Sequence, residues 1–388
     1  MVYLDNAASA PPSAAALQAF ATAAQEHYGN ASSAHGLGAA AARALQAARA
    51  DVLAFMRGDG GTVTFTSGGT EANALAVRGA ARARKQQPHV VVSAIEHPAV
   101  LRNVEALQSE GWHVDVVPPR PDGVVNAEDV LSRVTPKTGL VALMLANNEL
   151  GTLQPVDVVG RLCKELPRPP HVHVDAVAAA PFFAIDAQKL NVDSIAISGH
   201  KLAAPKGVGA LWLRKGARLV PLWHGGGQEA GLRSGTENVA GAVALARACV
   251  DVRAGLADAA AKVAKLRDDF EAAVCASVSI ATPTVATQTP RVPHICSVRL
   301  AGLPAEPLLH ALETHGVFAA AGSACASKSK GPSHVLTAIG VHEHDAVLRF
   351  SLSRQTTQQD CERAHEALVA AIAHIANVTD ARSARRSR

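Results

Sequence analysis

Small and polar residues follow several apolar runs of this sequence, at the points where strands are expected to end. In Thr66–Glu71 the glycines would expose backbone N–H groups at a helix start, where an anion such as phosphate is stabilised, although a plain capped turn has the same composition. Asp175 ends an alternating run and would cap a turn or hold a cationic ring nitrogen of a cofactor. Lys201, which follows Ser198–His200, is either a solvated charge or an amine able to form a Schiff base.

Three other side chains could contact a ligand near these motifs. Asn148, together with Asn147, follows the most apolar run and would orient a polar ligand or fix a turn. His97 lies just before Pro98, where a helix is expected to begin, and a lone histidine there can also be purely structural. Arg349 lies inside an apolar strand, so it must find an anionic partner or face a cleft. Its planar guanidinium suits a carboxylate.

The segment Gly322–Gly331 is small, polar and basic, and it contains Cys325. We expect a mobile loop with an exposed thiol, whose neighbouring lysines favour the thiolate. The other cysteines lie in apolar or helical contexts and are expected to be inert. Together these groups suit pyridoxal-phosphate chemistry on an amino acid. They would supply a site for the phosphate, an acid for the ring nitrogen, an amine, a guanidinium for the substrate carboxylate and a thiol.

Apolar runs alternate with helical runs between residues 62 and 213, a pattern that predicts an α/β fold with a mostly parallel central sheet flanked by helices. The expected strands cover 62–65, 89–93, 112–117, 140–145, 171–175, 194–198 and 210–213, and the expected helices cover 71–84, 99–110, 127–134 and 156–166. Ligands of such sheets bind beyond the carboxyl ends of the strands, which is where the polar motifs cluster.

The pattern changes after Asn238 to an Ala-rich helical region, 239–277, broken near Gly255. A polar stretch at 282–293 predicts a loop. The rest predicts a smaller α+β domain, with strands at 295–300, 317–320 and 347–352 and helices at 307–315, 333–339 and 358–375. We therefore expect a large domain at 13–254, a small domain made of 1–12 and 255–376, and a disordered basic tail at 377–388.

Composition narrows the class of protein. The chain has 388 residues and a net charge of +4, and the last eight residues carry four arginines and no acid, so the expected folded body is near neutral. This argues against direct nucleic-acid binding. Six scattered cysteines without a C-x-x-C pair suit the reducing cytoplasm and indicate no metal site. We expect neither a signal peptide nor a membrane span.

Taken together, the motifs resemble those of cysteine desulfurases of the NifS/IscS type, which belong to the class V aminotransferase group of fold-type-I pyridoxal-phosphate enzymes. The resemblance runs from Tyr3 to about Ile375, with its motifs in the family's order. These motifs are F-T-S-G-G-T-E-A-N at 65–73, E-H-P-A-V-L at 96–101, A-N-N-E-L-G at 146–151, H-V-D-A at 173–176, S-G-H-K at 198–201, P-K-G-V-G-A-L at 205–211, R-S-G-T-E-N at 233–238, G-S-A-C at 322–325 and R-F-S-L at 349–352.

The resemblance implies pyridoxal 5'-phosphate as cofactor and a role for each site residue. Lys201 would bind the cofactor covalently, Asp175 would pair with its ring nitrogen, and His97 would stack on the ring and assist proton transfer. The phosphate would be held by Gly69, Thr70, Ser198 and His200, with Gly199 also among the cofactor-binding residues. Thr236 would reach the phosphate of the neighbouring subunit of a homodimer. Asn148 would contact cofactor and substrate, and Arg349 would clamp the substrate carboxylate.

The resemblance also implies an activity. L-Cysteine would be converted to L-alanine while Cys325 takes the sulfur as a persulfide and passes it to an acceptor protein, either an iron–sulfur scaffold or a tRNA-thiolation protein. Seven residues separate Cys325 from the helix expected at Ser333, which is similar to the long-loop branch of the family.

The sequence departs from the family at Ala178, where a glutamine usually bonds the ring phenolic oxygen. Two alternatives stay open. One is another pyridoxal-phosphate lyase or aminotransferase on the same fold that does not use Cys325, and the other, suggested by Ala178 and the basic tail, is a non-catalytic interaction protein.

Overall fold

The computed structural model describes residues 1–322 and 333–386, with side chains up to Ile375. Its larger sheet has seven strands in the order β2-β8-β7-β6-β5-β3-β4. These are β2 (Gly61–Thr66), β3 (His89–Ser93), β4 (His113–Val117), β5 (Thr138–Ala142), β6 (His171–Asp175), β7 (Ser194–Ser198) and β8 (Gly209–Arg214). Six of the seven strands run in one direction and β8 runs opposite to them, so the predicted mostly parallel sheet is confirmed.

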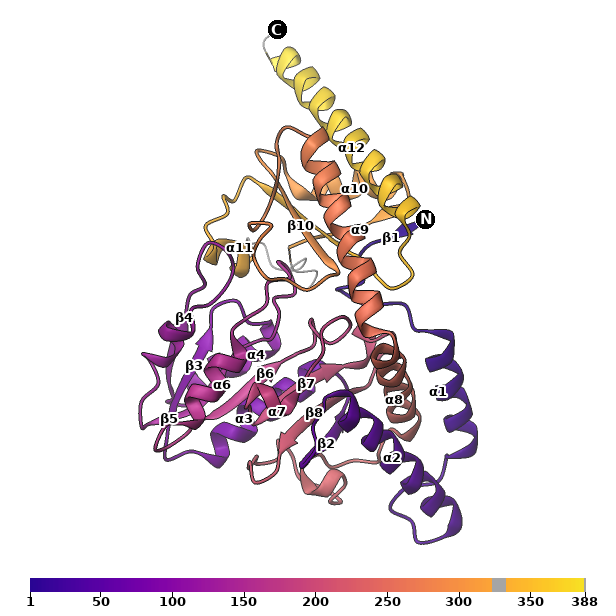
Figure 1. Cartoon of the computed structure of the whole chain (residues 1–388), viewed down its shortest axis with the longest axis vertical. Coiled ribbons are helices and arrows are strands. Elements are labelled where there is room, and N and C mark those ends of the chain that lie inside the picture. Colours follow the sequence, from indigo (N-terminus) through magenta and orange to yellow (C-terminus); the bar gives the residue numbers. More distant parts are fainter. Residues whose placement is uncertain (323–332, 387–388) are drawn as a thin grey trace.

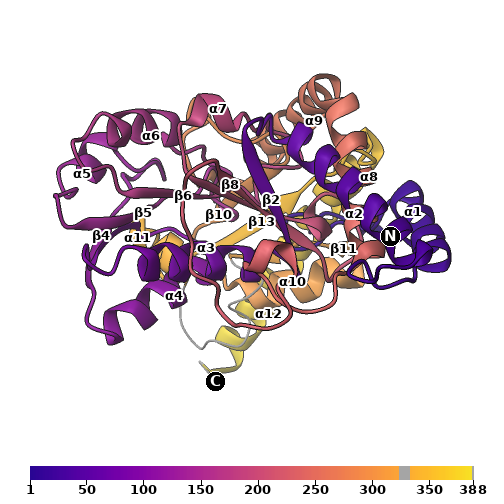
Figure 2. The same cartoon turned by 90° about the horizontal axis from the view of Figure 1, so that it is seen from below.

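Helices cover both faces of this sheet, since its central strands are apolar on both sides (Figure 2). One face packs on α3 (Gly69–Ala83) and α4 (Pro98–Ser109), through Val90 and Leu140. The other face, with Val91 and Val141, faces a core shared with most of the other helices. These are α2 (Gly36–Phe55), α5 (Ala127–Leu131), α6 (Val156–Lys164), α7 (Ala187–Leu190) and α8 (Val239–Ala254), with α1 (Ala14–Glu26) packed on α8.

A second, smaller core surrounds a four-stranded antiparallel sheet of order β12-β13-β10-β9 (Figure 1). Its strands are β9 (Ala281–Pro283), β10 (Ile295–Leu300), β12 (Ala320–Ala321) and β13 (Ala346–Ser351). Helices α9 (Leu256–Ser277), α10 (Ala305–Thr314) and α12 (Gln358–Arg386) contribute to this core, and α11 (His334–Ala338) lies outside it. The break between α8 and α9 falls at Gly255, as predicted. The division of the chain into two domains stays a prediction.

Three details differ from the sequence-based expectations. The single strand expected at 317–320 is two strands: β11 (Val317–Phe318) pairs with the N-terminal β1 (Val2–Tyr3), whereas β12 pairs with β13. Strand β9 overlaps the start of the loop expected at 282–293, because it pairs with the distant β10. Helix α12 continues to Arg386, where a disordered tail was expected from residue 377, since no proline or glycine follows Ile375 to end the helix.

Within the described part of the chain we find no helix able to span a membrane.

Candidate active site

A pocket of about 340 Å³ lies where β6 and β7 end. Nine predicted site residues line it: Gly69, Thr70, His97, Asn148, Asp175, Ser198, His200, Lys201 and Arg349. They come from segments far apart in the sequence, because the carboxyl ends of parallel strands meet at one edge of a sheet.

Three predicted residues are not among the lining residues. Gly199 is buried, and a Cβ there would lie 2.9 Å from Val208 Cγ1, so this glycine allows two segments to approach closely behind the pocket. Thr236 is exposed and does not line the pocket of its own protomer. Its predicted role toward a neighbouring subunit stays a prediction. Cys325 lies outside the described residues.

One end of the pocket is built to hold an anion. Helix α3 begins there after Gly68 and has no side-chain hydrogen bond at its N-cap. The hydroxyl oxygen of Ser198 is buried and has no hydrogen-bond partner among the described residues. A side chain at Gly69 would fill this space, since its Cβ would lie 3.3 Å from that of Ser198. Free helix amides, the positive end of the helix dipole and an unpartnered hydroxyl are together suited to bind a phosphate group.

His200 lies beside this anion site and is neutral. It follows Ser198 in the short 3₁₀ turn Gly199–Lys201. Burial, followed by the positive charge of Lys201, lowers the pKa of His200 to about 4. The ring therefore offers one N–H donor near pH 7 rather than a full charge.

Asp175 also lines the pocket, and it belongs to a series of buried polar side chains that are linked by hydrogen bonds. Its Oδ2 accepts a hydrogen bond from Asn73 Nδ2 at 2.7 Å, and its Oδ1 accepts from the Val177 amide at 2.9 Å. Asn73 Oδ1 in turn lies 2.9 Å from His173 Nε2, and Ser194 Oγ lies 2.9 Å from His173 Nδ1. Burial raises the pKa of Asp175, which makes a cationic partner in the pocket favourable.

The sequence motifs did not identify Asn73 and His173 as residues that support Asp175. Asn73 lies one helical turn after Gly69 on α3, a spacing that places both on the pocket side of the helix. His173 precedes Asp175 by two residues on β6, so the two share one face of the sheet. Burial lowers the pKa of His173 to about 3, so it is a neutral hydrogen-bonding group.

His97 is the N-cap residue of α4 and is held by the helix it caps. Its Nδ1 accepts a hydrogen bond from the Ala99 amide at 3.1 Å, which leaves Nε2 as the nitrogen that carries the proton. Burial lowers the pKa of His97, although the carboxylate of Asp175 opposes the shift. The ring is therefore neutral at pH 7, with a hydrogen-bond donor to offer.

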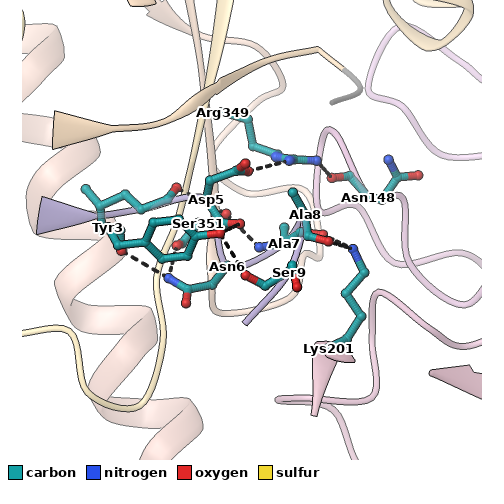
Figure 3. A network of polar contacts seen from close by, with 11 residues as sticks. Tyr3, Asp5, Asn6, Ala7, Ala8, Ser9, Asn148, Lys201, Arg349 and Ser351 are labelled. Atoms are coloured by element: carbon teal, nitrogen blue, oxygen red, sulfur yellow. Dashed lines mark hydrogen bonds and ion pairs between the residues drawn. The ribbon is translucent and has the colours of Figure 1, made fainter. Parts of the chain in front are cut away.

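The N-terminal segment completes the pocket, as Figure 3 shows. Lys201 Nζ donates hydrogen bonds to the carbonyls of Ala7 and Ala8, the latter at 2.7 Å. On the other side, Arg349 Nη2 lies 2.8 Å from Asp5 Oδ1, and Nη1 donates to the Asn148 carbonyl at 2.7 Å. The segment around Ala7 therefore lies between the amine and the guanidinium, and Asp5 is a site residue that the motifs did not identify.

Arg349 is buried, with 2% of its surface exposed, although it carries a full charge. Its Nε has no hydrogen-bond partner among the described residues. A buried guanidinium with one donor unused is stabilised by an anion that reaches it from the pocket.

We expect Ser198→Ala to weaken binding of pyridoxal 5'-phosphate without weakening the fold. Loss of one hydrogen bond to a charged group should raise the dissociation constant about tenfold to a hundredfold. The cofactor-free variant should be at least as stable as the wild type, because the substitution removes a buried hydroxyl without a partner. Cofactor titration and thermal unfolding would test both expectations. Unchanged affinity, with the exposed Ser32→Ala as control, would contradict the anion site.

Known proteins match this chain over most of its length. A family model described as "Aminotransferase class-V" matches residues 2–364. Cysteine desulfurase IscS from Clostridium botulinum is 38% identical over 314 residues, covering 79% of this chain and 78% of that protein. A solved structure described as a NifS-like protein has a TM-score of 0.88 at 32% identity, covering 96% of this chain and 99% of that one. The structure of SspA in complex with cysteine has a TM-score of 0.79 at 30% identity and covers 92% and 100% of the two chains.

Proposed function

Because the chain belongs to the class-V aminotransferase family and its homologues include cysteine desulfurases, we propose that it converts L-cysteine to L-alanine and transfers the sulfur through Cys325. The observation that carries the proposal is the pocket itself. It brings a lysine, a buried aspartate, an anion site and a buried arginine together from distant segments.

The family uses pyridoxal 5'-phosphate, and the residues of the pocket fit this group. The unpartnered Ser198 hydroxyl and the start of α3 would hold its phosphate, and Asp175 would hold its ring nitrogen. Lys201 would bind it covalently. When bound, the cofactor withdraws electrons from the α-carbon of the amino acid. Ala178, which lines the pocket in place of the family's glutamine, offers no hydrogen bond to the ring.

The protein's own groups would position the substrate and move its protons. Arg349 would hold the carboxylate of L-cysteine, kept in place by Asp5 and the Asn148 carbonyl. The amine of Lys201, released from the cofactor, would remove the proton from the α-carbon. His97 would donate from Nε2, the nitrogen that remains free to do so once Nδ1 caps α4.

Sulfur would leave the substrate by attack of the Cys325 thiolate on the sulfur atom of L-cysteine. The carbon–sulfur bond breaks, a sulfur–sulfur bond forms, and a proton replaces sulfur on the substrate carbon, giving L-alanine and a persulfide on Cys325. The described residues on either side of the segment that contains Cys325 lie near the pocket, which supports access of the thiolate to the substrate. Ser333 Oγ donates to Glu149 Oε2 at 2.6 Å, and a Cβ on Gly322 would lie 3.4 Å from the same oxygen. Glu149 directly follows Asn148 of the pocket.

The persulfide would then serve an acceptor protein, either an iron–sulfur scaffold or a tRNA-thiolation protein. We propose a cytoplasmic homodimer in which Thr236 reaches the phosphate of the neighbouring subunit. The exposed position of Thr236 supports this arrangement, because an exposed side chain is accessible to a second copy.

The proposal is tested by product analysis of the wild-type holoenzyme with L-cysteine and a reductant. We expect one L-alanine for each sulfide released. Pyruvate and ammonia in place of alanine would instead show a lyase. An amino group passed to an added keto acid would show an aminotransferase, and no turnover with cofactor bound would support the non-catalytic alternative.

A further inference from the structure

A second group of ligand-type side chains lies at the edge of the larger sheet, away from the pocket. His89 begins β3, whereas His97 of the pocket follows the other end of that strand. His113 and Asp115 lie on β4, which is one of the two edge strands of the sheet. We call His89, His113 and Asp115 the edge cluster.

Strand register brings these three side chains onto one face. β3 and β4 are parallel, and His89 is the register partner of His113. Alternate residues of a strand point to the same side, so Asp115 shares the face of His113. His89 Nε2 lies 3.1 Å from Asp115 Oδ2, His113 Nε2 lies 3.4 Å from Asp115 Oδ1, and the two ring centroids are 5.0 Å apart.

The two imidazole–carboxylate separations are close to those of a tetrahedral metal site. One ligand atom from each of the three residues can be chosen so that all lie within 4.8 Å of one another. With metal–ligand bonds of about 2.0–2.1 Å, neighbouring ligand atoms of a tetrahedral zinc site lie about 3.3 Å apart. The two imidazole–carboxylate separations, 3.1 and 3.4 Å, lie on either side of that value. The exposed His113 would have to move toward His89 and Asp115 to complete the site.

The buried histidine is also oriented as a metal ligand usually is. His89 is 5% exposed, and its Nδ1 lies 2.9 Å from the hydroxyl of Thr138 on β5. When Nδ1 donates its proton to this hydroxyl, the neutral ring directs the lone pair of Nε2 toward Asp115. Metal-bound histidines almost always have such a partner on the other ring nitrogen.

We propose that the edge cluster binds one divalent transition-metal ion such as Zn²⁺ and thereby links β3 to the edge strand β4. Two imidazoles and one carboxylate suit zinc, whereas Ca²⁺ and Mg²⁺ prefer oxygen ligands alone. Water would complete the coordination, since His113 is exposed and the site opens to solvent. The sequence by itself indicates no metal site, so an ion bound at the edge cluster would contradict that expectation.

The experiment is a titration of metal-free holoenzyme with Zn²⁺ alone, against a competing colorimetric chelator, for the wild type and His113→Ala. We expect the variant to lose one bound Zn²⁺ per chain, with an affinity loss at this site above about 100-fold, because even outer-shell changes cost about 10–100-fold. At a free Zn²⁺ concentration about 100 times the dissociation constant, the wild type should unfold about 3 °C higher than without metal, and the variant should not.

His310→Ala is the matched control, since His310 is exposed on α10, far from the edge cluster in the sequence. It should bind Zn²⁺ as the wild type does, whereas Asp115→Asn should behave as His113→Ala does. His113 is exposed, so its replacement should leave the metal-free unfolding temperature unchanged. Equal Zn²⁺ binding and equal stabilisation in wild type and His113→Ala would overturn the proposal.

Discussion

Replacement of Cys325 by alanine is expected to lower L-alanine formation from L-cysteine by at least about a thousandfold. The expectation follows from the chemistry of the step, because a thiolate must accept the sulfur atom before alanine can form. Cofactor binding should be unchanged, since the described pocket residues expected to hold the cofactor, among them Asp175, Ser198 and Lys201, are all retained in the variant. Alanine and sulfide should therefore be measured together with cofactor content.

A direct readout separates loss of sulfur transfer from general damage. After brief exposure to L-cysteine without reductant, the wild-type chain should gain the mass of one sulfur atom, and Cys325→Ala should gain none. Cys275→Ala is the matched control, because Cys275 is a partly exposed free cysteine on α9 outside the pocket. Full alanine formation by Cys325→Ala would mean that another group accepts the sulfur.

Replacement of Lys201 by alanine is the second large effect, with turnover expected to fall by about a thousandfold or more. Lys201 Nζ is the amine that the fold presents to the pocket, held by the carbonyls of Ala7 and Ala8. Removing it abolishes both the covalent attachment of the cofactor and the base for the α-proton. The anion site at Ser198 remains, so the variant should still bind the cofactor noncovalently.

Borohydride reduction followed by mass spectrometry measures covalent attachment of the cofactor without relying on activity. The wild type should retain one cofactor per chain, and Lys201→Ala should retain none after unfolding. Lys215→Ala, at an exposed lysine just after β8, should behave as the wild type does. Covalent cofactor on Lys201→Ala would assign the attachment to another lysine.

The two variants test different parts of one proposal. Cys325→Ala addresses the sulfur acceptor and leaves the cofactor site intact, whereas Lys201→Ala addresses the cofactor and leaves the thiol intact. If Cys325→Ala retains alanine formation and Lys201→Ala loses it, the protein is a pyridoxal-phosphate enzyme that does not use this thiol.

The architecture of the larger sheet could be predicted because each of its strands has a local sequence pattern. Strands such as His89–Ser93 and His171–Asp175 are continuous buried runs between turn residues, and they lie where the sequence predicts them. Because ligands of such sheets bind beyond the carboxyl ends of the strands, Asp175, Ser198 and Lys201 are expected to lie together at one edge of the sheet.

The smaller sheet was predicted less well, because its strands are short and depend on distant partners. Residues 317–320 look like one strand, but Val317–Phe318 pairs with the N-terminus and Ala320–Ala321 with β13. Ala281–Pro283 has little strand character of its own and is a strand only beside β10. Pairing between segments far apart in sequence has no local signature.

By itself, the sequence determined the fold class, the family resemblance and nine of the residues that line the pocket. The tertiary structure decided what those side chains touch: Asp5 against Arg349, the Ala7 and Ala8 carbonyls on Lys201, and Asn73 behind Asp175. The edge cluster belongs to the same category, since His89 and His113 meet only through the register of β3 and β4. The physical reason is common to all of them. A residue's type and local period follow from the chain, whereas a contact between residues of different helices, strands or loops exists only once those segments have packed against one another.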